Sequence, residues 1–423
     1  MVAVEPRGRL AAFVADVCEG FDRRSQRFSG ELYVRGLIEH GPRKSLQPTL
    51  FRLGESGARY ESMQQFVADS PWSGEALLRR VCERVAARLD VVCWVVDDTG
   101  FPKDGRCSPG VKRQYSGTLG KIGNCQIGVS LHAVGERGTL PLGWSLYLPE
   151  DWCDDRERRR RAKIPEDVVF RTKLELAAGL IAQAAGWEIP RGPILADEAY
   201  GDDGDFRVGL DDERLNYVVS VAAKTSVYGA DTRFSVPARA GAVGRLPCVS
   251  RADREPNSVL EVAAALPVEA WQALVYGASP EGTPRSSRFA CVRVFAVGEI
   301  RRLRRAPRCE WLVVEWPSGA EEPTDYWLSN LPAGTTPAEL ARLARLRWAV
   351  ELDYRQLKGE LGLDHYEGRS YAGWHHHCAL VTCAHAFLTV PRQGSTTRRR
   401  AWLALVADRQ PVRRARDAPG RDR

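Results

Sequence analysis

The chain has 423 residues, of which 44% are hydrophobic and 27% are charged, and its formal net charge is +7. These shares are typical of a globular protein, and the length predicts two or three structural units. No stretch approaches the roughly 20 consecutive apolar residues of a membrane helix, so we expect no membrane partner. Eleven scattered cysteines without a Cys-x-x-Cys pair indicate neither a disulfide framework nor a zinc knuckle, and they favour a reducing, cytoplasmic setting.

A helical N-terminal region is predicted over residues 1–90. Leu77, Val81 and Val85 recur at helical spacing. Shorter helices are expected near residues 9–21 and 30–39. No helix-turn-helix motif is evident, so only its position suggests that this region binds DNA.

A strand-rich segment follows over residues 91–222. Predicted strands cover residues 91–96, 126–134, 142–148, 193–196 and 217–221. A helix over 174–185 separates the third strand from the fourth, and its buried stripe is predicted to hold Leu174, Ala178, Ile181 and Ala185. Three strands, a helix and further strands resemble the order of an RNase H-like core.

Residues 223–335 are predicted to form a β-rich insertion between two parts of this core. The second part, 336–391, begins with Thr336-Pro337-Ala338-Glu339, a threonine N-cap with proline at the first helical position and glutamate three residues after the cap. One long amphipathic helix is expected to continue from there through Lys358. The apolar helix near residues 379–390 is expected to pack against the sheet.

Basic residues are concentrated in two places. The tail, 392–423, holds ten arginines and three aspartates, which accounts for the whole net charge. It is either a solvated, disordered end or a segment that attracts DNA phosphates through counterion release. The arginine-rich run 156–163 is likewise either a solvated loop or a clamp on the DNA backbone.

Three carboxylates lie on three separate predicted elements. Asp98 and Asp197 each follow an apolar strand, and Glu351 lies within the long helix. A strand that ends in a carboxylate presents oxygen ligands for Mg²⁺ at the rim of a sheet. Two such aspartates and a helical glutamate fit a two-metal phosphoryl-transfer site. Neighbouring strand residues face opposite ways, so we expect Asp98 to point into the site and Asp97 to cap the turn.

Further candidates lie around these acids. Arg347, Glu351, Tyr354 and Lys358 follow at steps of four, three and four, so they share one helix face. This face is either a solvated ion-pair surface or, as we favour, a phosphate-contacting surface beside the site. Lys121, close in sequence to the first acid, is a further candidate for DNA contact.

At these residues the chain resembles the DDE transposases of bacterial insertion sequences, in the group with a β-rich insertion before the catalytic glutamate. Val96-Asp97-Asp98-Thr99-Gly100 is similar to the family's first acidic segment, and Leu195-Ala196-Asp197-Glu198-Ala199-Tyr200 is similar to the second. The family's third motif is Tyr-x₂-Arg-x₃-Glu-x₆-Lys. Arg347, Glu351 and Lys358 match its spacing, whereas Ala344 stands at the tyrosine position.

The resemblance implies an α/β fold with an RNase H-like mixed-sheet core. It implies that Asp98, Asp197 and Glu351 are catalytic and bind Mg²⁺, for which Mn²⁺ would substitute. The implied activity is cut-and-paste transposition: cleavage at insertion-sequence ends and strand transfer into target DNA. The implied partners are double-stranded DNA and a second copy of the chain in the synaptic complex, near the nucleoid. Two alternatives remain, namely a non-cutting DNA-binding regulator derived from a transposase and an RNase H-like nuclease.

The run Trp374-His375-His376-His377-Cys378 suggests a metal site at first sight. Consecutive helix residues point about 100° apart, so three adjacent histidines cannot all ligate one ion. We therefore expect no metal there.

Overall fold

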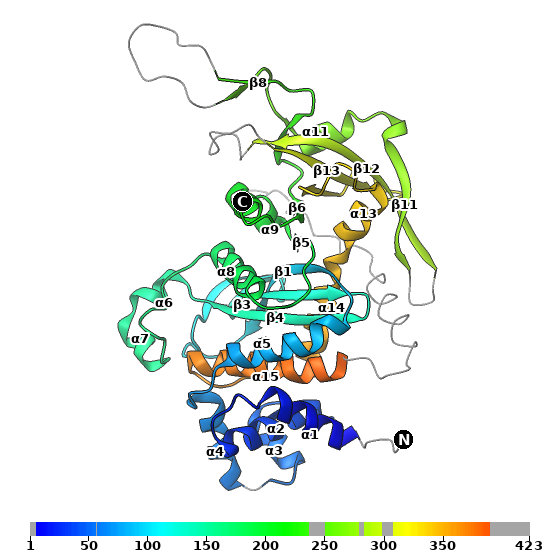
Figure 1. Cartoon of the computed structure of the whole chain (residues 1–423). Coiled ribbons are helices and arrows are strands. Elements are labelled where there is room, and N and C mark those ends of the chain that lie inside the picture. Colours follow the sequence, from blue (N-terminus) through cyan, green and yellow to red (C-terminus); the bar gives the residue numbers. More distant parts are fainter. Residues whose placement is uncertain (1–5, 56, 237–249, 279–282, 298–307, 390–423) are drawn as a thin grey trace, which may run out of the picture.

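The computed structural model describes residues 6–55, 57–236, 250–278, 283–297 and 308–389. The fold is α/β and layered around one large sheet, as Figure 1 shows. Helix α8 (Lys173–Ala185) covers one face of the core strands. Helices α5 (Gly74–Val85) and α15 (Tyr371–Thr389) cover the other face. The predicted RNase H-like mixed-sheet fold is confirmed.

Five strands form the core of the sheet. They are β1 (Val91–Pro102), β3 (Lys121–Gly135), β4 (Gly138–Tyr147), β5 (Ile194–Ala196) and β6 (Tyr217–Val221). Strand β3 pairs antiparallel with both β1 and β4, whereas β5 runs parallel to β1 and β6. The short strand β2 (Lys112–Ser116) pairs antiparallel with the first five residues of β3. This arrangement brings the middle of β1 next to the end of β5.

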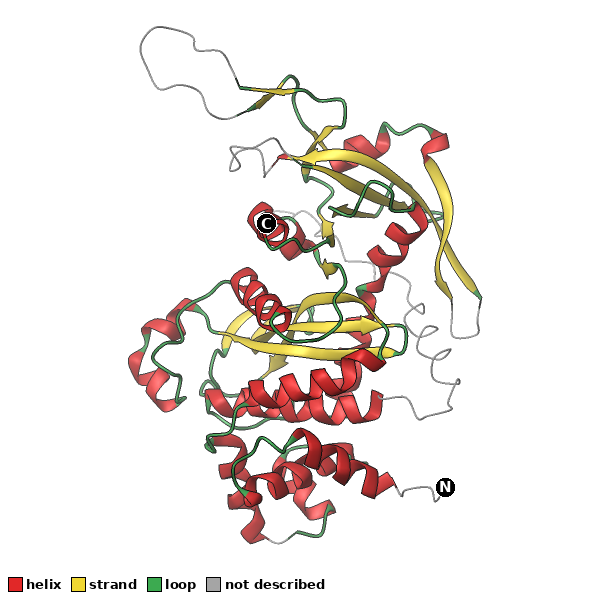
Figure 2. Ribbon diagram, viewed as in Figure 1, coloured by secondary structure: helices red, strands yellow, loops and turns green. Residues whose placement is uncertain are grey.

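The β-rich insertion extends the same sheet, visible as the upper yellow strands in Figure 2. Its main elements are β7 (Ser226–Gly229), α11 (Val259–Ala264), β11 (Trp271–Ala278), β12 (Pro284–Ala296), β13 (Cys309–Trp316) and β14 (Asp325–Ser329). Strand β14 pairs antiparallel with core strand β6, so backbone hydrogen bonds continue from the core into the insertion. The division of the chain at residues 223 and 335 remains a prediction.

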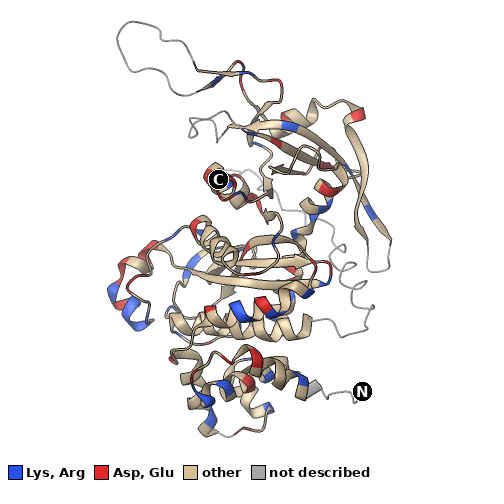
Figure 3. Ribbon diagram, in the orientation of Figure 1, with Lys and Arg blue, Asp and Glu red and all other residues tan. Residues whose placement is uncertain are grey.

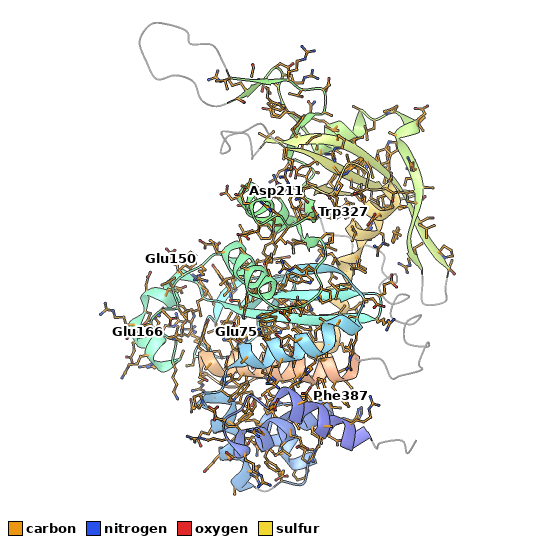
Figure 4. The ribbon with its side chains drawn as sticks, in the orientation of Figure 1. Glu75, Glu150, Glu166, Asp211, Trp327 and Phe387 are labelled. Atoms are coloured by element: carbon orange, nitrogen blue, oxygen red, sulfur yellow. The ribbon has the colours of Figure 1, made fainter. Side chains whose placement is uncertain are left out.

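The N-terminal region forms a helical layer on the far side of α15. It contains α1 (Pro6–Val17), α2 (Arg24–Ile38), α3 (Leu46–Arg52) and α4 (Gly57–Ala68). Helix α5 buries Leu77, Val81 and Val85, as their spacing predicts. At the other end of α15, the rings of Phe13 and Phe387 lie 5.8 Å apart, where Figure 4 labels Phe387. Helix α15 therefore contacts both the sheet and the N-terminal helices.

Three local predictions were wrong. Strand β1 continues through both aspartates to Pro102, because it pairs with β3 along its whole length. The buried stripe of α8 consists of Ala177, Leu180, Ile181 and Ala184, so it differs from the predicted stripe at three of its four positions. Residues 156–161 form the short helix α7, whose first turn is capped by the Asp155 carboxylate, on the charged arm that projects in Figure 3.

The long C-terminal helix is also interrupted. It divides into α13 (Pro337–Leu346) and α14 (Trp348–Gly359), with Arg347 between them. Arg345 anchors the end of α13 to the insertion through ion pairs with Glu315 and Asp325, and it lies 5.7 Å from the Trp327 ring labelled in Figure 4. The end of α13, just before Arg347, is thus fixed to the insertion.

Two further points concern partners. No helix within the described ranges is long and apolar enough to cross a membrane. The basic tail, 392–423, lies outside the described residues, so both interpretations of it remain open.

Candidate active site

Arg347 joins two acidic side chains at the start of α14. Its Nη1 lies 2.9 Å from Oδ2 of Asp97, and its Nη2 lies 3.2 Å from Oε1 of Glu351. Asp97 is the cross-strand partner of Ser130 on β3, and its side chain is 12% exposed. The structure therefore places Asp97, and not the predicted Asp98, beside Glu351. The helical spacing correctly predicted that Arg347 and Glu351 are neighbours.

Asp98 points to the opposite face of β1, as the alternation of strand residues requires. There its Oδ2 accepts a hydrogen bond of 2.8 Å from Nζ of Lys173, the first residue of α8. The start of α8 is fixed by a capping box between Thr172 and Glu175. Lys173 was not among the predicted site residues. The capping box is a sequence signal that fixes the helix start, but pairing with a residue 75 positions away is not visible in the sequence.

Asp197 lies directly after β5, as predicted. The parallel register pairs Val95 with Leu195, and its continuation by two residues, past the end of β5, sets Asp197 at the level of Asp97 on β1. One carboxylate oxygen of Asp197 accepts a hydrogen bond of 3.0 Å from the backbone N–H of Ala199. This bond caps the short helix α9 (Glu198–Gly201) and fixes the side chain at the edge of the sheet.

Electrostatics show that these acids act on one another. Burial raises the pKa of Asp97 to about 7; Arg347 opposes this shift, whereas Asp197 and Asp98 add to it. Burial also raises the pKa of Tyr200, and the same three aspartates raise it further. The aspartates Asp97, Asp98 and Asp197 are therefore close enough to influence one another electrostatically.

Lys358 occupies the far end of the same helix face. Its Nζ donates hydrogen bonds of 2.7 Å to the carbonyl of Gly100 and 3.2 Å to the hydroxyl of Thr118. Burial lowers its pKa to about 8. Lys358 is thus held against strand β1 just beyond the acids, with its amino group 5.6 Å from the Phe101 ring.

Carboxylate oxygens are hard donors of the kind that suits Mg²⁺. Arg347 forms ion pairs with Asp97 and Glu351, and Lys173 forms one with Asp98. The buried hydroxyl of Tyr200, beside these acids, has no hydrogen-bond partner in the described part of the chain. In the arrangement seen, no three acidic, histidine or cysteine side chains of the described residues converge on a metal position. The two cations hold carboxylate oxygens that an ion would use.

The other predicted contacts lie in different environments. Tyr354, a predicted DNA contact, is buried instead: it is 8% exposed and its hydroxyl lies 2.6 Å from that of Ser130. Lys121 is exposed at the start of β3, where a DNA contact remains a prediction.

Comparison with known proteins shows the family of this chain. Residues 16–280 match the family model described as DDE superfamily endonuclease, and residues 174–387 match the transposase DDE domain. The chain is also 25% identical, over 379 residues and 86% of each sequence, to the probable transposase for insertion sequence element IS701 from Microchaete diplosiphon. The predicted resemblance is confirmed, and the chain belongs to the DDE superfamily of transposases and endonucleases.

Proposed function

We propose that this protein is a cut-and-paste DNA transposase that cleaves at the ends of an insertion sequence and joins the freed ends to target DNA. The observation that supports it best is the convergence of Asp97 and Glu351 on Arg347, with Asp197 at the same level of the neighbouring strand. These acids come from separate elements of a chain that belongs to the DDE superfamily.

The three acids of the proposed site are Asp97, Asp197 and Glu351. Asp97 replaces Asp98 in this proposal, because it shares the α14 face with Glu351 while Asp98 pairs with Lys173. These carboxylates would hold divalent cations, Mg²⁺ or in its place Mn²⁺. When bound, such ions activate a water for attack on a phosphodiester and stabilise the leaving oxygen.

The cations of the site have a second role in this proposal. Arg347 pairs with two carboxylates before DNA binds, and its planar guanidinium suits bidentate contact with a phosphate afterwards. Lys358, at the other end of the helix face, would contact a neighbouring phosphate as a point charge. Exposed Lys121 would hold the DNA backbone without reading its sequence.

The proposed partners are double-stranded DNA and a second copy of the chain. Synapsis of two element ends requires at least a dimer in action. The proposed setting is the cytoplasm, at the nucleoid.

The test is cleavage of a supercoiled plasmid that carries the DNA flanking the coding sequence, with Mg²⁺ or Mn²⁺. We expect cuts at matched inverted ends and joined products, and both should be absent for Glu351→Gln. Cuts without joined products would favour an endonuclease, as the description of the first family model suggests. Binding without cuts by the wild-type protein would favour a DNA-binding regulator.

A further inference from the structure

A chain of buried, hydrogen-bonded side chains links α14 to the sheet beneath the acidic site. Oδ2 of Asp353 lies 2.8 Å from Nδ1 of His132, and Nε2 of His132 lies 2.9 Å from Oγ of Ser130. Oγ of Ser130 lies 2.6 Å from the hydroxyl of Tyr354. All four residues are buried, with exposed fractions between 0% and 8%. The first and last residues of this hydrogen-bonded series, Asp353 and Tyr354, therefore lie on α14, and the two between them lie on β3.

Asp353 is the point where four elements meet. Besides His132 on β3, its carboxylate accepts a hydrogen bond from the Thr139 hydroxyl on β4. Its Oδ1 also lies 3.3 Å from Nε2 of His385 on α15. A buried carboxylate is tolerated only when such partners satisfy it. The arrangement thus ties α14 to β3, β4 and α15 through one side chain.

The network ends beside the proposed catalytic acids. Ser130 is the cross-strand partner of Asp97, and such partners have side chains on the same face, about 5 Å apart at Cβ. Tyr354 stands three residues after Glu351 on α14, a spacing that places the two on one side of the helix. Asp97 and Glu351, which must approach one another, are each next to a member of the network.

We propose that Asp353, His132, Ser130 and Tyr354 form a positioning network that fixes α14 against β3 so that Glu351 stays opposite Asp97. Apolar packing is non-directional and would permit small rotations and shifts of the helix. Hydrogen bonds lose strength steeply with misalignment, so a chain anchored at two adjacent helix residues fixes both rotation and translation. A displacement of 1 Å at a catalytic group can cost about 10²-fold in rate. The inference rests on the proposed function of Glu351.

The test uses variants that remove one link each: Tyr354→Phe, Ser130→Ala and the double variant. The matched control is Tyr33→Phe. Tyr33 lies on α2 in the N-terminal layer, is also buried, and has its hydroxyl 2.8 Å from Nδ1 of His377. Single-turnover cleavage of the plasmid with its flanking DNA is measured with Mn²⁺, together with DNA affinity and thermal stability.

We expect Tyr354→Phe and Ser130→Ala each to lower the cleavage rate about tenfold or more while DNA affinity stays within twofold. Links of one chain act as a unit, so the double variant should be no slower than the slower single variant. Ser130→Thr, which keeps the hydroxyl, should recover most of the rate, and Tyr33→Phe should cleave within twofold of wild type.

Two results would overturn the inference. One is a wild-type rate in Tyr354→Phe and Ser130→Ala while Glu351→Gln is inactive, which leaves the proposed function standing without the network. The other is that Tyr354→Phe and Ser130→Ala lose cleavage rate only in proportion to their loss of folded protein, and lose no more than the control Tyr33→Phe. If Glu351→Gln itself cleaves normally, the proposed function fails, and the positioning role fails with it.

Discussion

Two polar clusters stand out in the sequence, and they differ in how their polar groups are paired in the structure. In the acidic cluster around Arg347, the carboxylates outnumber their cations, and burial raises the pKa of Asp97 to about 7. In the histidine cluster of α15, each ring is held by the protein itself. His376 lies 2.8 Å from the carbonyl oxygens of both Val67 and Trp72, and His377 lies 3.1 Å from that of Gly362.

The difference shows how a structural cluster can be distinguished from a chemical one. Nε2 of His377 faces carbonyl oxygens and must donate, so Nδ1 accepts from the Tyr33 hydroxyl 2.8 Å away. The ring is satisfied, and it joins α15 to the N-terminal helices. The acids, in contrast, retain unfavourable charge that a ligand cation would relieve. Substitutions should therefore have opposite effects on stability and activity in the two clusters.

The largest effect is expected from Asp197→Asn in the acidic cluster. Loss of a ligand carboxylate should lower the cleavage rate by about 10³-fold or more, which corresponds to about 4 kcal/mol. Since Asp197 raises the pKa of Asp97, its removal relieves repulsion, and the melting temperature should stay equal or rise. Single-turnover cleavage and calorimetry measure the two quantities. A folded variant that cleaves normally would place Asp197 outside the site.

The opposite pattern is expected from His377→Leu in the histidine cluster. Loss of its hydrogen bonds removes the partner of the Tyr33 hydroxyl and of the Gly362 and Leu363 carbonyls, which should lower the free energy of unfolding by about 2–3 kcal/mol. The cleavage rate per folded molecule should not change. Urea unfolding and active-site titration separate the two. A loss of cleavage at full stability would contradict a structural role.

The histidine cluster should also make stability depend on pH. Burial lowers the pKa of His377 to about 4 in the folded protein, against an ordinary value of about 6.5. The folded state therefore resists a proton that the unfolded chain accepts, so stability is complete above pH 6.5 and declines as pH falls towards 4. One such histidine accounts for up to about 3 kcal/mol. Urea unfolding between pH 7.5 and 4.5 should show this decline, and His377→Leu should reduce it.

The smallest effect is expected at Lys121, which is exposed and outside both clusters. Lys121→Ala should weaken DNA binding about twofold and reduce the salt slope of binding by about one, as expected for one phosphate contact. Fluorescence anisotropy over a range of salt concentrations measures both. An unchanged slope would remove Lys121 from the DNA-binding surface.

Residue spacing along the sequence correctly predicted contacts within one helix, because helix geometry alone determines them. Arg347 and Glu351 are neighbours because they stand four residues apart, and the helix break at Arg347 does not disturb this. The choice between Asp97 and Asp98 needed the fold. The alternation of side chains along a strand predicts that the two residues face opposite ways. Only the pairing with β3 and the packing of α14 determine that Asp97 is the one that shares Arg347 with Glu351.

Long-range partners were not predictable for the same reason. Tyr354 was predicted to contact DNA, yet it is buried with its hydroxyl beside that of Ser130, which is 224 residues away in the chain. A pattern of residue types identifies a helix face but not the surface that covers it.

The most direct test of the central claim compares Asp97→Asn with Asp98→Asn in the plasmid cleavage assay. The two residues are adjacent on β1, but only Asp97 shares Arg347 with Glu351. We predict that Asp97→Asn abolishes cleavage while DNA binding persists, and that Asp98→Asn retains measurable cleavage. Normal cleavage by Asp97→Asn together with an inactive Asp98→Asn would contradict the assignment of the active site to the α14 face.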